Sequence, residues 1–223
     1  MSTIDPLELN AVDQAAPQAN RALAVRYWAG FVSVPAAFAS MLIAVLLVGA
    51  AGDGAPSAEL AAFARGGAAS AVPFLELANA AALIGLDAFF GTSIRGRGSW
   101  LATLGIGATF LGALGSTMVA MRHFYDLALA SAPQAVSLSV LRSLDTVMGP
   151  LPLLLTSLAP TVGVVLLAIA AFRAGGASII ALALALAYAV LEYTPLPESV
   201  GILVGGVAFT WIAVRMVRMR RRA

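Results

Sequence analysis

The feature that most constrains this chain is a series of six long apolar segments, each near the length that a helix needs to cross a bilayer. At a rise of about 1.5 Å per residue, about 18 or more apolar residues span a hydrocarbon core about 30 Å thick. Barrel strands are excluded because they alternate apolar and polar residues, whereas these segments are apolar on all sides. The sequence therefore predicts an all-α membrane bundle with six spans, at 28–50, 71–94, 100–121, 149–172, 177–193 and 200–217.

The composition of the chain agrees with lipid as its surrounding solvent. Hydrophobic residues make up 61% of it and charged residues 11%, which leaves too few polar side chains to cover a water-facing surface. We expect a polar segment at 1–27, a six-helix domain at 28–217 and a basic tail at 218–223. Residues 1–20 lack the basic start and short apolar core of a cleavable signal peptide, so the first span is expected to remain in the protein.

The thirteen basic residues are all arginines, and they divide unevenly between the two sides of the predicted bundle. One side carries Arg21, Arg26, Arg95, Arg97, Arg173, Arg215, Arg218, Arg220, Arg221 and Arg222. The other side carries Arg65, Arg122 and Arg142. Because the positive side is cytoplasmic, we predict that both ends of the chain are cytoplasmic and that this is a multi-pass protein of the cell inner membrane. Arginine in place of lysine, with abundant Ala and Gly, is typical of GC-rich bacterial genes.

The residue types that are missing exclude several kinds of chemistry. Without lysine there is no retinal Schiff base and no lysine nucleophile. Without cysteine there is no disulfide, iron–sulfur cluster, thiolate haem ligand or cysteine nucleophile. The single histidine, His123, cannot form a bis-histidine haem or three-histidine metal site, and no acidic residues near it have the spacing of a known metal site. We therefore predict no cofactor and no metal.

Two carboxylates in the second span are the strongest functional signal, because a charge in hydrocarbon normally faces a bundle interior or water. Glu76 and Asp87 are eleven residues apart, which places them within about 20° of one helical face and roughly 16 Å apart in depth. Asn79 lies near that face. A proton or cation path would have this pattern. Alternatively, Glu76 contacts interfacial water and Asp87 pairs with Arg95 or Arg97.

A second polar group is expected where the outer ends of the spans meet. It consists of Arg122, His123, Tyr125, Asp126, Arg142, Asp145, Glu192, Tyr193 and Glu198. The spacing from Arg122 to Asp126 is i, i+4 and that from His123 to Asp126 is i, i+3, so local ion pairing could account for these three. The alternative is an outward-opening pocket in which His123 and the carboxylate of Glu76 or Glu192 bind a cation or deliver a proton.

The two longer outer segments receive different predictions. Segment 51–70 is expected to be a loop. In segment 134–148, Val136, Val140 and Leu144 recur at helical spacing, which indicates either a short interfacial helix or an early start of the fourth span. Both interpretations stay open.

Small residues at a spacing of four predict where helices approach each other closely in lipid. They form three sets, on the third, fifth and sixth spans respectively: Ala108, Gly112 and Ser116; Ala181, Ala185 and Ala189; Gly201 and Gly205. We expect these faces to lie inside the bundle, with homodimerisation through Gly201 and Gly205 as the alternative. The basic run after the last span is expected to contact anionic lipid headgroups, at about 1 kcal/mol per residue, and not nucleic acid.

Two short motifs carry a resemblance to known proteins. They are the Arg95-Gly96-Arg97-Gly98 turn and the passage from Ala170 to Gly175 into another apolar helix. With them the chain resembles uncharacterised six-helix membrane protein families that are common in GC-rich bacteria. The resemblance implies an integral inner-membrane bundle and transfers no catalytic residue.

No motif identifies a substrate or a reaction. The leading hypothesis is a non-enzymatic bundle that binds or moves a small or lipophilic molecule through an outward-facing polar pocket. The residues expected to bind the ligand or a proton are Glu76, Asn79, His123, Tyr125, Asp126, Asp145 and Glu192. The alternative is a metal-independent intramembrane enzyme that uses a carboxylic acid on an isoprenoid or lipid, as terpene cyclases do, with Glu76, Asp87 and Glu192 as candidates. A third hypothesis is a structural partner subunit, which a solid core without a cavity would favour.

Overall fold

The computed structural model describes residues 6–49, 56–148, 150–151 and 154–220. It is 89% helical, and these residues form no strand. The helices are α1 (Pro6–Gly49), α2 (Pro56–Arg65), α3 (Val72–Ser93), α4 (Ser99–Leu129), α5 (Gln134–Met148), α7 (Ala159–Arg173), α8 (Ile179–Leu191) and α9 (Glu198–Arg220). Shorter turns between them are η1 (Gly67–Ala71), η2 (Gly96–Gly98) and the π-helical η3 (Leu154–Leu158). The predicted all-α class is therefore confirmed.

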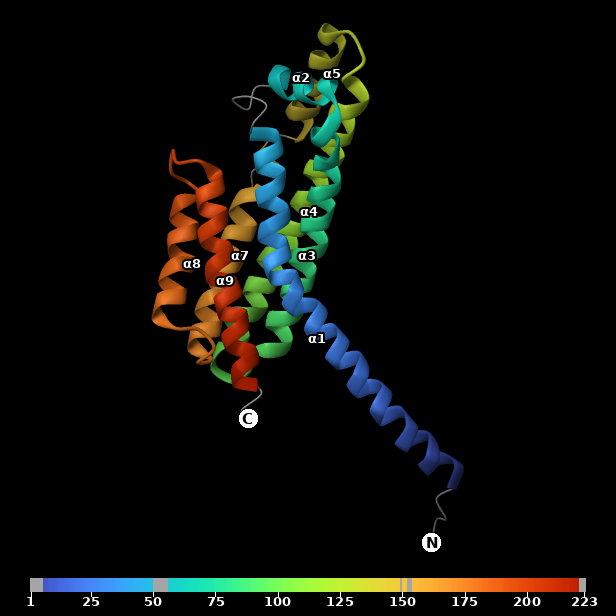
Figure 1. The fold of residues 1–223 in the computed structure, drawn as a ribbon, viewed down its shortest axis with the longest axis vertical. Helices are drawn as coiled ribbons and strands as arrows, with labels where there is room; N and C mark the ends of the chain where they lie inside the picture. Colours follow the sequence, from blue (N-terminus) through green and yellow to red (C-terminus); the bar gives the residue numbers. More distant parts are fainter. Residues whose placement is uncertain (1–5, 50–55, 149, 152–153, 221–223) are drawn as a thin grey trace.

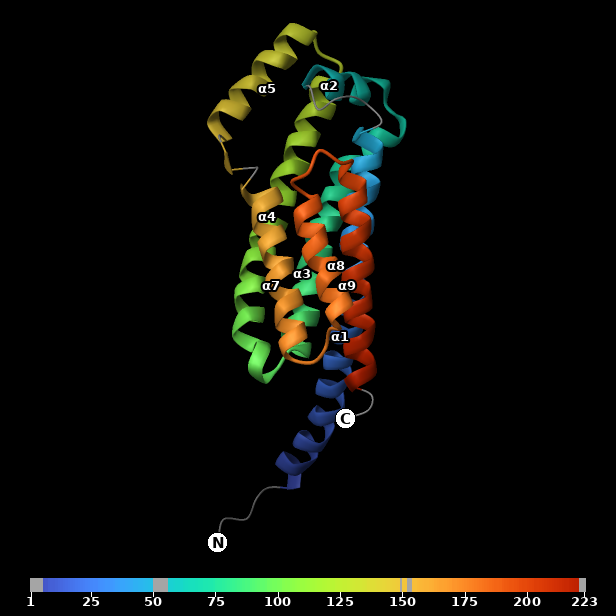
Figure 2. The ribbon, with the colours of Figure 1, turned by 90° about the vertical axis from the view of Figure 1, so that its left-hand side faces the viewer.

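The long helices run side by side as one bundle. Its members are α3, α4, α7, α8, α9 and the C-terminal half of α1, whereas the N-terminal half of α1 extends beyond the bundle (Figure 1). Within the bundle α1 packs against α3 and α9, α4 packs between α3 and α7, and α8 packs on α9. Helices α2 and α5 form a cap at the opposite end from the projecting part of α1 (Figure 2).

Five segments of the described chain are long and apolar enough to cross a membrane. They are Ala24–Leu47, Gly67–Ser93, Gly96–Leu129, Leu154–Arg173 and Glu198–Arg220. The remaining bundle helix, α8, has 13 residues and is therefore about 20 Å long, which is shorter than a hydrocarbon core of about 30 Å. Ser178 begins it, since its hydroxyl accepts a hydrogen bond from the amide of Ala181 at 3.2 Å. A sixth crossing stays a prediction.

Several helices are longer than the apolar segments that predicted them. Helix α1 begins at Pro6 and not at residue 28, because Ala, Leu, Glu and Gln favour helix whether or not the segment is apolar. Helix α4 continues about two turns past the predicted end at residue 121. Its extension carries the ion pair of Arg122 and Asp126, whose i, i+4 spacing supports the helix across polar residues.

The predictions for the two outer segments, 51–70 and 134–148, compare differently with the structure. The prediction of a loop at 51–70 is wrong, because α2 forms there, with Pro56 at its start and Leu60 and Phe63 buried on one side. Segment 134–148 forms a separate helix, α5, with the predicted bounds. Its position at a membrane interface stays a prediction.

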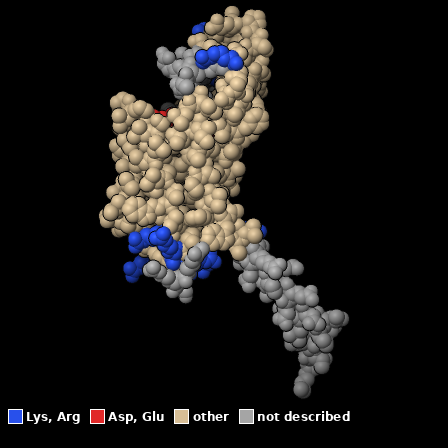
Figure 3. All heavy atoms as spheres, viewed as in Figure 1, with Lys and Arg blue, Asp and Glu red and all other residues tan. Residues whose placement is uncertain are grey.

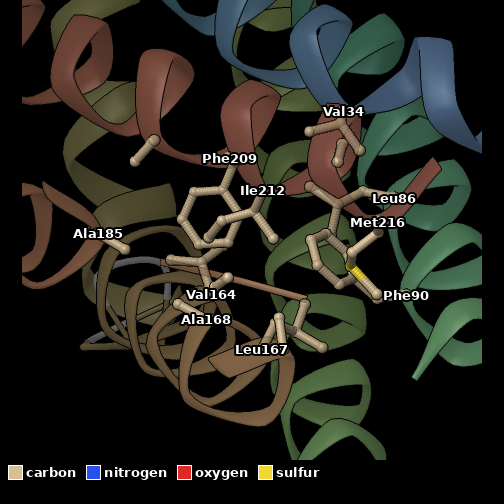
Figure 4. Packing of buried hydrophobic residues seen from close by; sticks show 14 of the residues in the cluster. Val34, Leu86, Phe90, Val164, Leu167, Ala168, Ala185, Phe209, Ile212 and Met216 are labelled. Atoms are coloured by element: carbon tan, nitrogen blue, oxygen red, sulfur yellow. The ribbon is translucent and has the colours of Figure 1, made fainter. Parts of the chain in front are cut away.

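The core of the bundle lies between α1, α3, α4, α7, α8 and α9. Phe90 on α3 and Phe209 on α9 are fully buried and meet edge to face, with ring centroids 6.1 Å apart. Leu167 of α7 and Ile212 of α9 pack in the same cluster (Figure 4). This apolar centre extends along α9 from Ile202 to Val217.

Glycines allow α4 and α7 to come into backbone contact. A Cβ added at Gly163 would lie 2.6 Å from the amide nitrogen of Thr109, and one added at Gly112 would lie 2.6 Å from Cβ of Pro160. A Cβ added at Gly205 on α9 would lie 2.7 Å from Phe38 of α1. The predicted bundle-internal placement is therefore confirmed for Gly112 and Gly205, while a homodimer through α9 stays a prediction.

The contact between α4 and α7 predicts a clear difference between two glycine variants. Gly163→Ala is expected to lower the free energy of unfolding by about 1–3 kcal/mol, because the added methyl group forces two backbones apart. Gly107→Ala is the matched control, since an added Cβ there meets no atom within 4 Å. It is expected to be neutral or to stabilise by up to about 1 kcal/mol. Thermal unfolding in detergent measures both, and equal losses would contradict the close contact.

Candidate functional site

A cavity of about 630 Å³ lies at the end of the bundle beneath the cap of α2 and α5. In the space-filling view, acidic atoms show in the hollow between the ends of α8 and α9 and that cap (Figure 3). The polar residues that line the cavity are Glu76, Asn79, Ser116, His123, Thr156, Ser157, Tyr188, Glu192, Thr194 and Glu198. Apolar walls include Phe38, Met41 and Leu83. We call this the acidic pocket.

Helices that are distant in sequence bring the ionisable groups of the acidic pocket together. Glu76 is near the start of α3, His123 is in the last third of α4, and Glu192 and Glu198 flank the turn between α8 and α9. Neighbouring helices are antiparallel, so the start of α3 meets the later part of α4 at the same end of the bundle (Figure 2). Among the residues that the structure describes, no arginine lines this pocket. Its lining is therefore rich in acids and lacks an internal counter-charge.

An amide–hydroxyl pair joins α3 to α4 beside Glu76. The Asn79 amide nitrogen donates a hydrogen bond to the Ser116 hydroxyl at 3.1 Å, and both side chains are buried. Asn79 is three residues from Glu76, so both lie on the face of α3 that lines the pocket, as the helical spacing predicted. The pair therefore joins the carboxylate-bearing face of α3 to α4.

His123 occupies the wall of the pocket under α2. Its ring packs on Phe63 of α2, with centroids 5.6 Å apart and planes at 44°. The Nδ1 atom is buried and has no hydrogen-bond partner within the described part of the chain. The imidazole is therefore held in place by an aromatic contact, and this nitrogen is left available to a ligand.

Glu192 ends α8 at the edge of the pocket. It is half-buried, and its Oε2 atom is buried without a hydrogen-bond partner among the described residues. Burial, and to a smaller extent the negative charge of Glu198, raises the pKa of the Glu192 carboxyl to about 7. This group therefore changes its charge in the neutral pH range.

Asp87 lies outside the acidic pocket although it shares a helix face with Glu76. Its side chain is buried, and Oδ1 accepts a hydrogen bond from the hydroxyl of Thr109 on α4. The alternative interpretation, in which Asp87 pairs with Arg95 or Arg97, is not observed, since no ion pair joins these three described residues. A polar stripe on α3 is therefore present, but its two carboxylates lie in separate surroundings.

Three further predicted site residues are not placed in the pocket. Tyr125 is 50% exposed, and Asp126 is fully buried and forms an ion pair with Arg122 at 3.3 Å. Local ion pairing thus accounts for Arg122 and Asp126, in agreement with the first of the two interpretations of the sequence. The side chain of Asp145 lies outside the described residues. The pocket therefore keeps Glu76, Asn79, His123 and Glu192 of the predicted set.

Some pocket residues were missed by the sequence analysis. Tyr188 is buried, contacts Phe38 edge to face and precedes Glu192 by four residues, so helical spacing alone could have placed it. Thr156 and Ser157 come from η3. Pro160 lacks an amide donor, and its ring clashes with the preceding turn, which explains the widened π-helical turn η3. The proline alone does not mark η3 as part of a site.

The described residues contain no group of three His, Asp or Glu side chains that could hold a metal ion. No family model, curated protein or solved structure matches this chain. The fold and pocket together define its class as an all-α bundle with helices of membrane-spanning length and an acidic cavity. The resemblance to six-helix families stays a prediction.

The pKa of Glu192 predicts how stability depends on pH. The folded carboxyl binds its proton more tightly than the unfolded one, whose pKa is near 4.5. The stabilisation from this group is therefore complete below pH 4.5 and is lost as the pH rises to about 7. Between pH 4.5 and 8 the free energy of unfolding of Glu192→Gln is expected to fall by about 2 kcal/mol less than that of the unmodified protein. This value allows for the partial exposure of the group.

Thermal unfolding of both proteins between pH 4.5 and 8 measures the effect. Glu198→Gln serves as a second variant, because it removes the smaller, electrostatic contribution to the pKa of Glu192 together with the Glu198 carboxyl itself. An unchanged pH dependence in Glu192→Gln would contradict the assignment.

Proposed function

We propose that this protein is an integral membrane protein that binds or moves a small or lipophilic molecule through the acidic pocket. In this proposal the chain crosses the membrane six times, both of its ends are cytoplasmic, and the pocket faces outward. The observation that carries the proposal is the convergence of three glutamates and the single histidine, from α3, α4 and the α8–α9 turn, on one cavity. Its described lining contains no arginine.

The distribution of arginine supports this orientation. Basic side chains gather at the end of the bundle opposite the acidic pocket (Figure 3). That end, which we call the arginine end, contains the α3–α4 turn, the α7–α8 turn and the end of α9, with Arg95, Arg97, Arg173 and Arg218. Positively charged ends favour the cytoplasmic side. Inner-membrane localisation and a bacterial source belong to the same proposal.

The lining of the pocket supports a ligand with a cationic or hydrogen-bond-donating group on an apolar body. Carboxylates and an imidazole nitrogen accept hydrogen bonds or attract positive charge, while Phe38, Met41 and Leu83 provide apolar contacts. A volume of about 630 Å³ lies within the range of about 300–1,000 Å³ that is typical of small-molecule sites. A structural partner subunit is less well supported, because its core would need no such cavity.

An intramembrane enzyme is the second candidate, and one specific observation favours it. The Glu192 carboxyl, with a pKa of about 7 and an unpartnered Oε2, is suited to donate a proton inside a mainly apolar cavity. Incubation of the purified protein with isoprenoid or lipid candidates in detergent distinguishes the two functions. Product that is abolished by Glu192→Gln supports the enzyme, and unchanged lipid supports the binding protein.

A charge-neutral variant tests the acidic pocket directly. Glu76→Gln is expected to weaken binding of the lipophilic cation tetraphenylphosphonium by about tenfold or more, because one charge–charge attraction of about 1.4 kcal/mol is removed. Equilibrium binding to purified protein and uptake into proteoliposomes provide the two measurements. Asp87→Asn is the matched control, since it makes the same charge change on the same helix outside the cavity. Equal effects of the two variants would contradict the assignment.

The orientation has its own test. Reporter fusions after Arg97 and after the end of α9 are both expected to be cytoplasmic, and a fusion in α5 is expected to be on the outer side. These results follow from the positive-inside rule. Reporters at Arg97 and at the end of α9 on opposite sides of the membrane would overturn the six-crossing topology.

A further inference from the structure

A second cavity, of about 610 Å³, is an apolar groove between α1 and α9. Pro35 and Leu42 of α1 form one wall, and Leu203, Val207 and Trp211 of α9 form the other. These α9 side chains are exposed by between 43% and 58%, so this face of the helix is covered by no other part of the described chain. We call it the α1–α9 groove.

The length of the groove suits one lipid chain. From Leu203 to Arg218 the axis of α9 rises about 22 Å, which exceeds half of a hydrocarbon core of about 30 Å. Gly206 of α9 lines the groove close to Phe38 of α1. Because glycine has no side chain, α9 does not obstruct the groove at this point. An extended acyl chain from one leaflet can therefore lie along it.

A single positive charge marks one end of the groove. Arg218 is the only charged residue of its described lining, is exposed and forms no ion pair with another described residue. Arg220, by contrast, contacts an aromatic ring, with its guanidinium 4.4 Å from the ring centroid of Tyr27. An apolar groove that ends at a guanidinium without an ion pair to any described residue is complementary to an apolar chain that ends in a phosphate.

We propose that the α1–α9 groove binds an anionic glycerophospholipid, with one acyl chain along α9 and the phosphate on Arg218. A second copy of this chain fits less well. Two copies in one membrane share an orientation, so pairing through this face would bring the two Arg218 side chains to the same end, where like charges repel. This site lies apart from the acidic pocket and does not depend on the function proposed for it.

Trp211 provides a direct reporter for the groove. Phe substitutions at Trp28 and Trp100 leave it as the only tryptophan of the chain. In vesicles, brominated phosphatidylglycerol is expected to quench its fluorescence at a several-fold lower mole fraction than brominated phosphatidylcholine does. Arg218→Gln is expected to reduce this preference about fivefold, and Arg218→Lys to retain most of it. Arg97→Gln removes the same charge at the same end of the bundle, away from the groove, and is expected to change nothing.

The outcomes separate the possible occupants. Circular dichroism first verifies that each variant keeps its helical content, and added unlabelled phosphatidylglycerol is expected to relieve the quenching in the Arg218 protein. Equal quenching by both lipids, unchanged by Arg218→Gln, would show only general lipid contact and overturn the proposal. Protection of Trp211 from both lipids, with energy transfer between labelled copies, would assign the groove to a second chain instead.

Discussion

The close contact of α4 with α7 is the constraint on which the rest of this structure depends. In lipid no hydrophobic drive pushes helices together, so their approach relies on small residues that allow van der Waals packing. Gly112 and Gly163 provide it here, and Gly112 lies directly against Pro160. Pro160 in turn follows the π-helical turn whose Thr156 and Ser157 line the acidic pocket. The packing of two backbones thus determines where one wall of the site lies.

Separation of charge is the second organising feature. The acidic pocket and the arginine end occupy opposite ends of one bundle, with an apolar core between them (Figures 3 and 4). Arg122 comes directly before His123 in the sequence, yet it is paired with the buried Asp126 and does not line the pocket. The cation next to His123 in the sequence is thus held in an ion pair outside the pocket lining.

Much of this arrangement could be predicted from the sequence, for physical reasons. Apolar length marks the bundle helices, and helical spacing places Glu76 and Asn79 on one face. The same spacing predicted the pair of Arg122 and Asp126. What could not be predicted depends on contacts between distant segments: the burial of Asp87 against Thr109 and the packing of α2 on the pocket wall arise only from tertiary structure. The start of α1 was placed too late and the end of α4 too early, because helix propensity continues beyond the apolar residues.

A cationic ligand and a proton would compete for the same carboxyl in the acidic pocket. A positive charge near Glu192 stabilises its ionised form and lowers the pKa from about 7. By linkage, a ligand that lowers a pKa must bind more tightly as the pH rises through that value, and it releases a proton when it binds. Glu198, which repels the ionised form of Glu192, favours this exchange because a cation relieves the repulsion between the two. Under the proposed function, this exchange would couple ligand movement to protons in a transporter and would make the affinity of a binding protein increase with pH.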